Sequence, residues 1–417
     1  PPGPYRQSER SDIYRQHADQ LLDSGHAFRC FCTTERLDAL RKTQMEEKQQ
    51  VGYDGHCLHL EQVEISKRLA NNESHVVRMN VPREGHCVFD DMLRGEISID
   101  WSQIDLQVLL KADGMPTYHL ANVVDDHLME ISHVIRGEEW INSAPKHILL
   151  YQYFGWETPV FCHLPLLRNI DKSKLSKRKN PTSILFYQRM GYLPEALINY
   201  LGRMGWSMPD EREKFTLAEM LEVFDIQRVS LGGPVFDVEK LSWLNGMWIR
   251  EELSDEQLAD RLQEWALNRD TLKAFLPFAK QRMETLSDIA PLGSYLISGM
   301  LPISADDLRS AGMEDEQLLE VLQFALWRLE SVQQWSRDNV FNALKAVADG
   351  MDIKLKPFLA PLFIAIAGSS ASISVMDSMN LLGADMSRAR LRSAIELLGG
   401  IGKKKLKKLE KGYQELG

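Results

Sequence analysis

The 417-residue sequence has no apolar run long enough to cross a lipid bilayer. Its longest apolar run covers residues 358–368 and is interrupted by Pro361. No signal peptide can be recognised, and because the sequence begins with Pro1 rather than Met, we expect the natural start to lie upstream. These features predict a protein without helical membrane spans and without a membrane partner.

Cysteine is scarce, with five residues in the whole chain. An odd and small number does not suit a disulfide framework, and it indicates a reducing compartment such as the cytoplasm, where cysteines serve as thiols or metal ligands. Four ligand-type residues form two pairs, Cys30-x-Cys32 and Cys57-x-His59. Two such pairs can place three thiolates and one imidazole around a tetrahedral Zn²⁺. The alternative is three buried free thiols beside a surface histidine, and His56 and His86-Cys87 are rival ligands.

Positive charge is also in deficit, since 49 Lys and Arg face 59 Asp and Glu, for a net charge of -10. This balance excludes bulk electrostatic binding of nucleic acid but leaves room for local basic patches. Residues 381–417 contain nine basic and four acidic residues, a net of +5. This patch is either a solvated helix face or a contact for RNA phosphates.

A second basic stretch, residues 171–179, holds five cations among nine residues. It follows an apolar run at 164–167 and precedes a helix that is predicted to begin at Pro194. Such a loop can neutralise charge on a polyphosphate leaving group, although a solvated loop or a nucleic-acid patch would have the same composition.

Between these features, residues 75–118 alternate as strands do, and residues 131–135 predict a short buried strand with Arg136 at its carboxyl end. Arg136 is then a candidate receptor for a carboxylate or phosphate, because its planar fork binds two oxygens at once. The alternative is an ion pair with Glu138 or Glu139. From residue 180 onward the pattern is mainly helical, with capping boxes predicted at Thr216 and Ser254.

The order Lys174-Leu175-Ser176-Lys177-Arg178 resembles the Lys-Met-Ser-Lys loop of class I aminoacyl-tRNA synthetases, in the form typical of glutamyl-tRNA synthetases. Residues 118–126, 134–140 and 230–237 resemble further blocks of that family, in the same order. From Tyr5 to its end, the chain is similar to bacterial-type glutamyl-tRNA synthetases.

The resemblance implies a multidomain fold, α/β plus all-α, with a Rossmann-like catalytic domain that is split by an α/β acceptor-binding insertion. The implied parts are a remnant of the first Rossmann half (1–10), the acceptor-stem-binding insertion with the zinc site (11–117), the second Rossmann half (118–170), the signature loop with the stem-contact domain (171–253) and a helical anticodon-binding region (254–417).

The resemblance also implies roles for particular residues. It implies that glutamate is held by Tyr118, Asn122 and Arg136. It implies that ATP, with Mg²⁺, is bound by Glu139, Trp140, Lys174, Ser176 and Lys177, of which Lys174 and Lys177 are catalytic. It implies a structural Zn²⁺ at Cys30, Cys32, Cys57 and His59. The implied reaction has two steps: the glutamate carboxylate attacks the α-phosphate of ATP, and a ribose hydroxyl of glutamate tRNA then takes the acyl group.

The sequence departs from the family in one respect. In the family, the Tyr5 segment follows the first Rossmann half, which carries the ATP motif, and only four residues precede Tyr5 here. We therefore expect that this chain alone does not activate glutamate. A truncated tRNA-binding remnant and a glutamyl-queuosine-tRNA synthetase-like paralogue are the alternatives. The paralogue lacks the helical anticodon region, and a glutaminyl-tRNA synthetase would carry a β-barrel there instead. The family implies a monomer.

Overall fold

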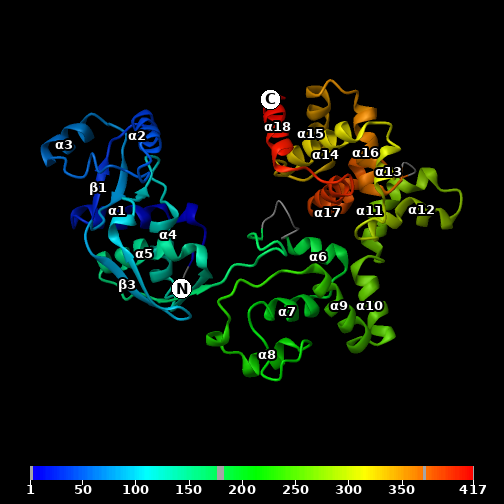
Figure 1. Ribbon diagram of the computed structural model, residues 1–417, viewed down its shortest axis with the longest axis horizontal. Helices are drawn as coiled ribbons and strands as arrows, with labels where there is room; N and C mark the ends of the chain where they lie inside the picture. The colour runs from blue at the N-terminus through cyan, green and yellow to red at the C-terminus, as the bar shows by residue number, and fades with distance from the viewer. Residues whose placement is uncertain (1–2, 176–182, 370–371, 417) are drawn as a thin grey trace. The chain divides into compact units, whose positions relative to one another are not determined.

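The computed structural model describes residues 3–175, 183–369 and 372–416 (Figure 1). The chain forms two compact units. The first contains Pro1–Leu167 and Asp225–Pro234, and the second contains Arg168–Phe224 and Val235–Gly417. The finer division into five parts stays a prediction. Within the described ranges, no helix combines the length and the apolar character that a bilayer crossing requires.

The first unit contains two β-sheets. A three-stranded antiparallel sheet has the order β1-β2-β5, from Ala27–Cys30, Val76–Met79 and Val108–Leu110. A four-stranded mixed sheet has the order β4-β3-β7-β6, from Gly95–Asp100, His86–Asp91, Val160–Leu164 and His133–Gly137. β3 and β4 form an antiparallel hairpin, whereas β7 runs parallel to both β3 and β6. The alternating pattern of residues 75–118 therefore predicted strands correctly.

Five α-helices accompany these sheets: α1 (Ser11–Asp23), α2 (Thr34–Glu46), α3 (Gln62–Ala70), α4 (Tyr118–Leu128) and α5 (Ala144–Phe154). α1 buries Tyr14, Ala18 and Leu21, which helical spacing places on one face. α4 packs against α1 and α5, and its buried residues join the same apolar core. The buried apolar face of α4 thus fixes this helix against the core. Its opposite face carries predicted site residues.

The prediction of a buried strand at 131–135 is wrong in two respects. The strand is β6, which begins at His133 and ends at Gly137, so Arg136 lies inside it. None of its residues is fully buried: His133 and Ile135 are exposed, at 52% for Ile135, and the other three are half-buried. The reason is that β6 is the edge of its sheet, where β7 is its partner within the described residues. A run of β-branched residues cannot by itself distinguish a central strand from an edge strand.

The second unit is helical in its described part (Figure 1). Thr216 and Ser254 each form the capping box that the sequence predicts, and a helix begins at Pro194 as expected. The helices are α6 (Ile184–Met190), α7 (Pro194–Gly202), α8 (Leu217–Val223), α9 (Val238–Glu252), α10 (Asp255–Trp265), α11 (Arg269–Ala279), α12 (Ile289–Gly293), α13 (Ala305–Arg309), α14 (Asp315–Glu330), α15 (Arg337–Gly350), α16 (Leu355–Ala367), α17 (Val375–Leu397) and α18 (Lys403–Gln414).

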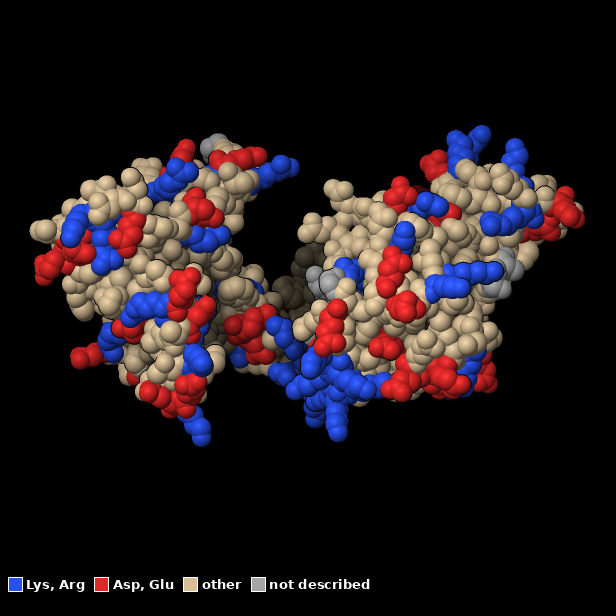
Figure 2. Space-filling view, turned by 90° about the horizontal axis from the view of Figure 1, so that it is seen from above, with Lys and Arg blue, Asp and Glu red and all other residues tan. Residues whose placement is uncertain are grey.

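The basic C-terminal patch is smaller than the sequence suggests. Arg390 of α17 is 2% exposed and donates hydrogen bonds to the backbone carbonyls of Gly299, Tyr295 and Ile366. It therefore binds the helices of its own unit together and is not available to a partner. The lysines of α18 remain, and basic side chains gather where this helix lies (Figure 2). A contact between this face and RNA phosphates stays a prediction.

Candidate functional site

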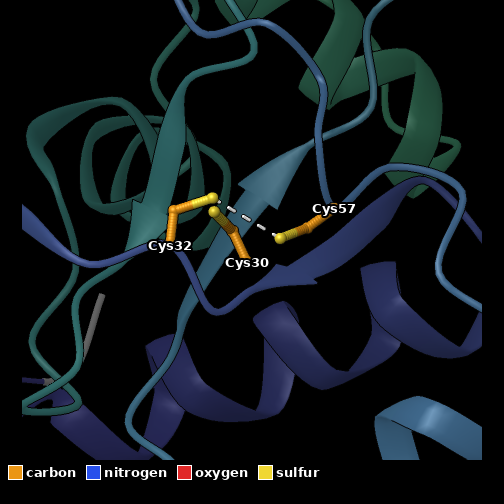
Figure 3. A group of neighbouring side chains, drawn as sticks. All are labelled: Cys30, Cys32 and Cys57. Atoms are coloured by element: carbon orange, nitrogen blue, oxygen red, sulfur yellow. Dashed lines mark hydrogen bonds between the residues drawn. The ribbon is translucent and has the colours of Figure 1, made fainter. Parts of the chain in front are cut away.

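Three cysteines that the sequence predicts as zinc ligands meet in the first unit (Figure 3). Cys30 ends β1, Cys32 follows two residues later, and Cys57 lies in a turn before α3. Their sulfur atoms all lie within 4.8 Å of one another, and Cys32 Sγ is 3.6 Å from Cys57 Sγ. Thiolates bound to one tetrahedral Zn²⁺ at about 2.3 Å are separated by about 3.8 Å. The three thiols therefore fit the sulfur face of a zinc site.

Tyr53 is a member of this cluster that the sequence reasoning missed. Its phenolic oxygen lies 3.3 Å from Cys30 Sγ and 3.6 Å from Cys32 Sγ, and it accepts a hydrogen bond of 2.8 Å from the Cys57 backbone N–H. The hydrogen bond between the Cys30 and Cys57 thiols lowers the pKa of Cys30 and raises that of Cys57, so this pair favours one thiolate beside one thiol. A tyrosine four residues before a ligand carries no metal signal in a sequence.

His59, the predicted fourth ligand, is exposed and is not among the atoms that lie within 4.8 Å of one another. Its role stays a prediction. The rival ligand Cys87 is buried outside this group, where burial raises the pKa of its thiol to about 11. His56 is exposed and also lies outside the group.

The predicted glutamate-binding residues lie together in the first unit. Tyr118 and Asn122 occupy one face of α4 together with Asp126, at four-residue spacing. Asn122 Nδ2 donates to Asp126 Oδ2 at 3.1 Å, and burial raises the pKa of Asp126 to about 6. The rings of Tyr118 and Trp140 lie 4.8 Å apart, and the Arg136 guanidinium lies 5.8 Å from the Trp140 ring.

Arg136 is held by two histidines rather than by a carboxylate. Its Nε donates to His163 Nε2 at 3.1 Å, and its Nη1 contacts His147 Nδ1 at 3.2 Å. Its Nη2 is buried and has no hydrogen-bond partner among the residues that the structure describes. Burial lowers the pKa of Arg136, because the charged form loses solvation. A desolvated guanidinium with an unpaired nitrogen favours an anion as its partner.

The alternative prediction, an ion pair between Arg136 and a nearby glutamate, is wrong for the described residues. Glu138 pairs instead with Arg94 of the β3–β4 turn, at 2.8 Å. Glu139 is exposed at the start of the short 3₁₀ helix Glu138–Ser143, and Arg136 makes no ion pair with it. Strand geometry explains this outcome, since the Arg136 side chain points toward β7 and the buried histidines.

The signature loop belongs to the second unit, and Ser176 and Lys177 lie outside the described residues. Lys174 is exposed, and a turn precedes it. Asn169 is 6% exposed and donates to Ser173 Oγ at 2.9 Å and to the Lys174 carbonyl at 3.2 Å. Lys172 adopts a φ of 63°, which closes this turn. The polar side chain of Asn169 thus sets the path of the chain into the motif.

Comparison with known proteins identifies the family. Residues 1–243 match the family described as tRNA synthetases class I (E and Q), catalytic domain, and residues 257–395 match an anticodon binding domain. Proteins named glutamate–tRNA ligase from Marinomonas sp. and Cellvibrio japonicus are each 64% identical over 416 residues, which is 100% of this chain and 84% and 82% of the relatives. The relative of that name from Pseudomonas aeruginosa is 59% identical over 411 residues, 99% of this chain and 83% of the relative.

Solved structures agree with these sequences. A glutamate tRNA ligase from Elizabethkingia meningosepticum, in complex with its amino acid, shares 30% identity with a TM-score of 0.59, and the match covers 95% of this chain and 84% of that one. Sequence identity along the whole chain, domains in the family's order and a related solved fold all lead to one assignment. This chain belongs to the glutamate–tRNA ligase family of class I tRNA synthetases.

Proposed function

We propose that the enzyme formed by this chain activates L-glutamate with ATP and transfers the glutamyl group to the 3′ end of glutamate tRNA. The family assignment gives the reaction class, and the observation that carries the substrate is Arg136. This guanidinium is desolvated and forms no ion pair with a carboxylate of the described residues, where Asp126 acts on it only through its charge. Its Nη2 has no hydrogen-bond partner among these residues. A buried arginine prefers a carboxylate to a neutral amide, which supports glutamate over glutamine.

The residues around Arg136 support a binding role more than a chemical one. Tyr118 and Trp140 supply aromatic walls, and Asn122 supplies an amide whose orientation is fixed by Asp126. Neither step of the reaction needs a protein nucleophile, because the substrate carboxylate and the tRNA hydroxyl attack directly. Positioning and charge stabilisation therefore carry the catalysis. ATP enters with Mg²⁺ as a substrate, and we assign its contacts to Glu139, Trp140, Lys174, Ser176 and Lys177.

The anticodon-domain match over residues 257–395 favours this function over that of a glutamyl-queuosine paralogue, which lacks the helical region.

We place the protein in the cytoplasm, since all five cysteines are free thiols and three of them gather as a candidate zinc site. In that site we assign Zn²⁺ a structural role, held by Cys30, Cys32 and Cys57 with His59 as the proposed fourth ligand.

We expect Lys177→Ala to lower kcat for glutamate activation about 100-fold with little change in the glutamate KM. The reason is that an ammonium which meets the pyrophosphate mainly as its charge develops stabilises the transition state. ATP–pyrophosphate exchange in the complete enzyme measures the effect. Lys172→Ala, which removes a cation of the same loop outside the motif, is the matched control and should keep its rate. Equal exchange rates for the Lys177→Ala and unaltered enzymes would refute the assignment.

A further inference from the structure

Behind Arg136 lies a continuous row of buried polar groups that no sequence motif indicates. On one side, His163 Nδ1 lies 2.7 Å from Asp91 Oδ2, and its Nε2 lies 3.1 Å from Arg136 Nε. On the other side, His147 Nδ1 lies 3.2 Å from Arg136 Nη1, and its Nε2 lies 2.9 Å from His119 Nδ1. His163 and His147 are 0% and 1% exposed, and Asp91 is 3% exposed.

Arginine nitrogens can only donate hydrogen bonds, and this fixes the proton on each histidine. His163 must accept at Nε2, so it carries its proton on Nδ1 and donates it to Asp91. His147 must accept at Nδ1, so it donates from Nε2 to His119. Burial lowers the pKa values of both histidines, which agrees with neutral rings. The guanidinium is thus held by neutral acceptors.

Asp91 is fixed independently of Arg136. Its Oδ1 accepts the backbone N–H groups of Leu93 and Arg94, each at 3.1 Å, and its Oδ2 accepts the His163 backbone N–H at 3.0 Å as well as the ring. The β3–β4 turn therefore sets the position of the carboxylate, and the carboxylate sets the tautomer of His163. The negative charge stays one imidazole away from Arg136, so it does not occupy the guanidinium.

We infer that Asp91 and His163 are positioning residues for glutamate recognition: they hold the Arg136 guanidinium through a neutral acceptor and leave its Nη2 unpaired for the substrate carboxylate. This inference rests on the proposed function, in which Arg136 receives glutamate. A carboxylate directly on Arg136 would hold it equally well but would compete with the substrate. The competing interpretation is that the Asp91–His163 bond only ties β3 to β7, which are adjacent parallel strands.

Two substitutions of His163 separate these interpretations. His163→Phe keeps a flat ring but removes both nitrogens, whereas His163→Gln can place a carbonyl oxygen near the former Nε2 and loses the bond to Asp91. We expect His163→Phe to raise the glutamate KM about tenfold, because a charged donor loses its partner, with ATP KM nearly unchanged. His163→Gln should keep the glutamate KM within about threefold of the original even if its thermal midpoint falls.

Asp91→Asn gives a second route in case His163→Phe does not fold. The Asn oxygen can keep the backbone N–H groups of Leu93 and Arg94, which leaves its NH2 group facing His163. There the NH2 group donates to Nδ1 and loses the bond from the His163 backbone N–H, so stability should fall. Donation to Nδ1 moves the ring proton to Nε2, where it faces Arg136 Nε–H. The glutamate KM should again rise about tenfold. Cys162→Ala is the matched control: Cys162 is fully buried on β7 beside His163, and strand alternation places it on the opposite face. It should lower stability without changing the glutamate KM.

Arg136→Ala is the last variant of the set. The glutamate KM and kcat of every variant are measured by glutamate-dependent ATP–pyrophosphate exchange in the complete enzyme. If Arg136→Ala leaves the glutamate KM and kcat unchanged, both the substrate assignment and this inference are wrong. If Arg136→Ala is impaired but His163→Phe and Asp91→Asn match Cys162→Ala in glutamate KM, only this inference is overturned. A glutamate KM raised in His163→Phe and kept in His163→Gln supports it, and equal losses in both would contradict it.

Discussion

Arg136→Ala should lower kcat/KM for glutamate roughly 10- to 150-fold, because losing a charged hydrogen bond costs about 1.5–3 kcal/mol. The substrate carboxylate would face His147 and His163, which offer acceptors rather than donors toward Arg136. ATP affinity should change much less, since the proposed phosphate contacts lie on the signature loop. Glutamate-dependent ATP–pyrophosphate exchange, with glutamate and ATP varied separately, measures both quantities.

Arg136→Lys is the second informative variant. It keeps the positive charge but removes the planar guanidinium, which can donate two parallel hydrogen bonds. A lysine ammonium cannot contact His147, His163 and a substrate carboxylate in the arginine's geometry, so most of the loss should remain. The thermal midpoint must be measured alongside, since removing Arg136 also leaves two buried histidines without a donor. A lower midpoint with unchanged glutamate kinetics would mean that Arg136 is a structural group.

Local patterns predicted the elements that depend on near neighbours. The capping boxes at Thr216 and Ser254 and the helix that begins at Pro194 all form as expected, because each depends on residues within one turn. β6 was misplaced because its exposure depends on sheet order, which no local pattern encodes. The same limit applies to Arg390, which the sequence counts as surface charge and the fold buries.

The surroundings of Arg136 were beyond sequence reasoning for a related reason. The residue itself could be chosen from its motif, but its partners come from α5 and β7, 11 and 27 residues away. Asp91 lies 72 residues from His163 and belongs to the β3–β4 hairpin. The available signals were the histidines in the apolar stretches of β7 and α5, and a buried histidine is more often structural than functional. A residue that contacts the substrate can be found from a short motif, whereas the residues that orient it can lie far away in the sequence.

Cys57→Ser should remove most of the bound zinc and destabilise the first unit around β1. We expect about one equivalent of Zn²⁺ in freshly purified, chelator-free protein, since three thiols already lie at the spacing of a zinc site. A structural zinc contributes folding free energy directly, so the variant should show a lower thermal midpoint and faster proteolysis near residues 30–57. Less than about a tenth of an equivalent in the unaltered protein would exclude the site.

Controls identify which residues hold the metal. Cys87→Ser removes a thiol that is equally buried, at 3% exposure for both cysteines, but that lies outside the cluster, so zinc content should stay at about one equivalent. His59→Ala and Tyr53→Phe then test the fourth position. Loss of zinc in His59→Ala would require the exposed imidazole to turn toward the thiols when the metal binds. Loss in Tyr53→Phe alone would instead mean that zinc binding depends on the phenolic hydroxyl, which lies 3.3 Å from Cys30 Sγ and hydrogen-bonds with the cysteines.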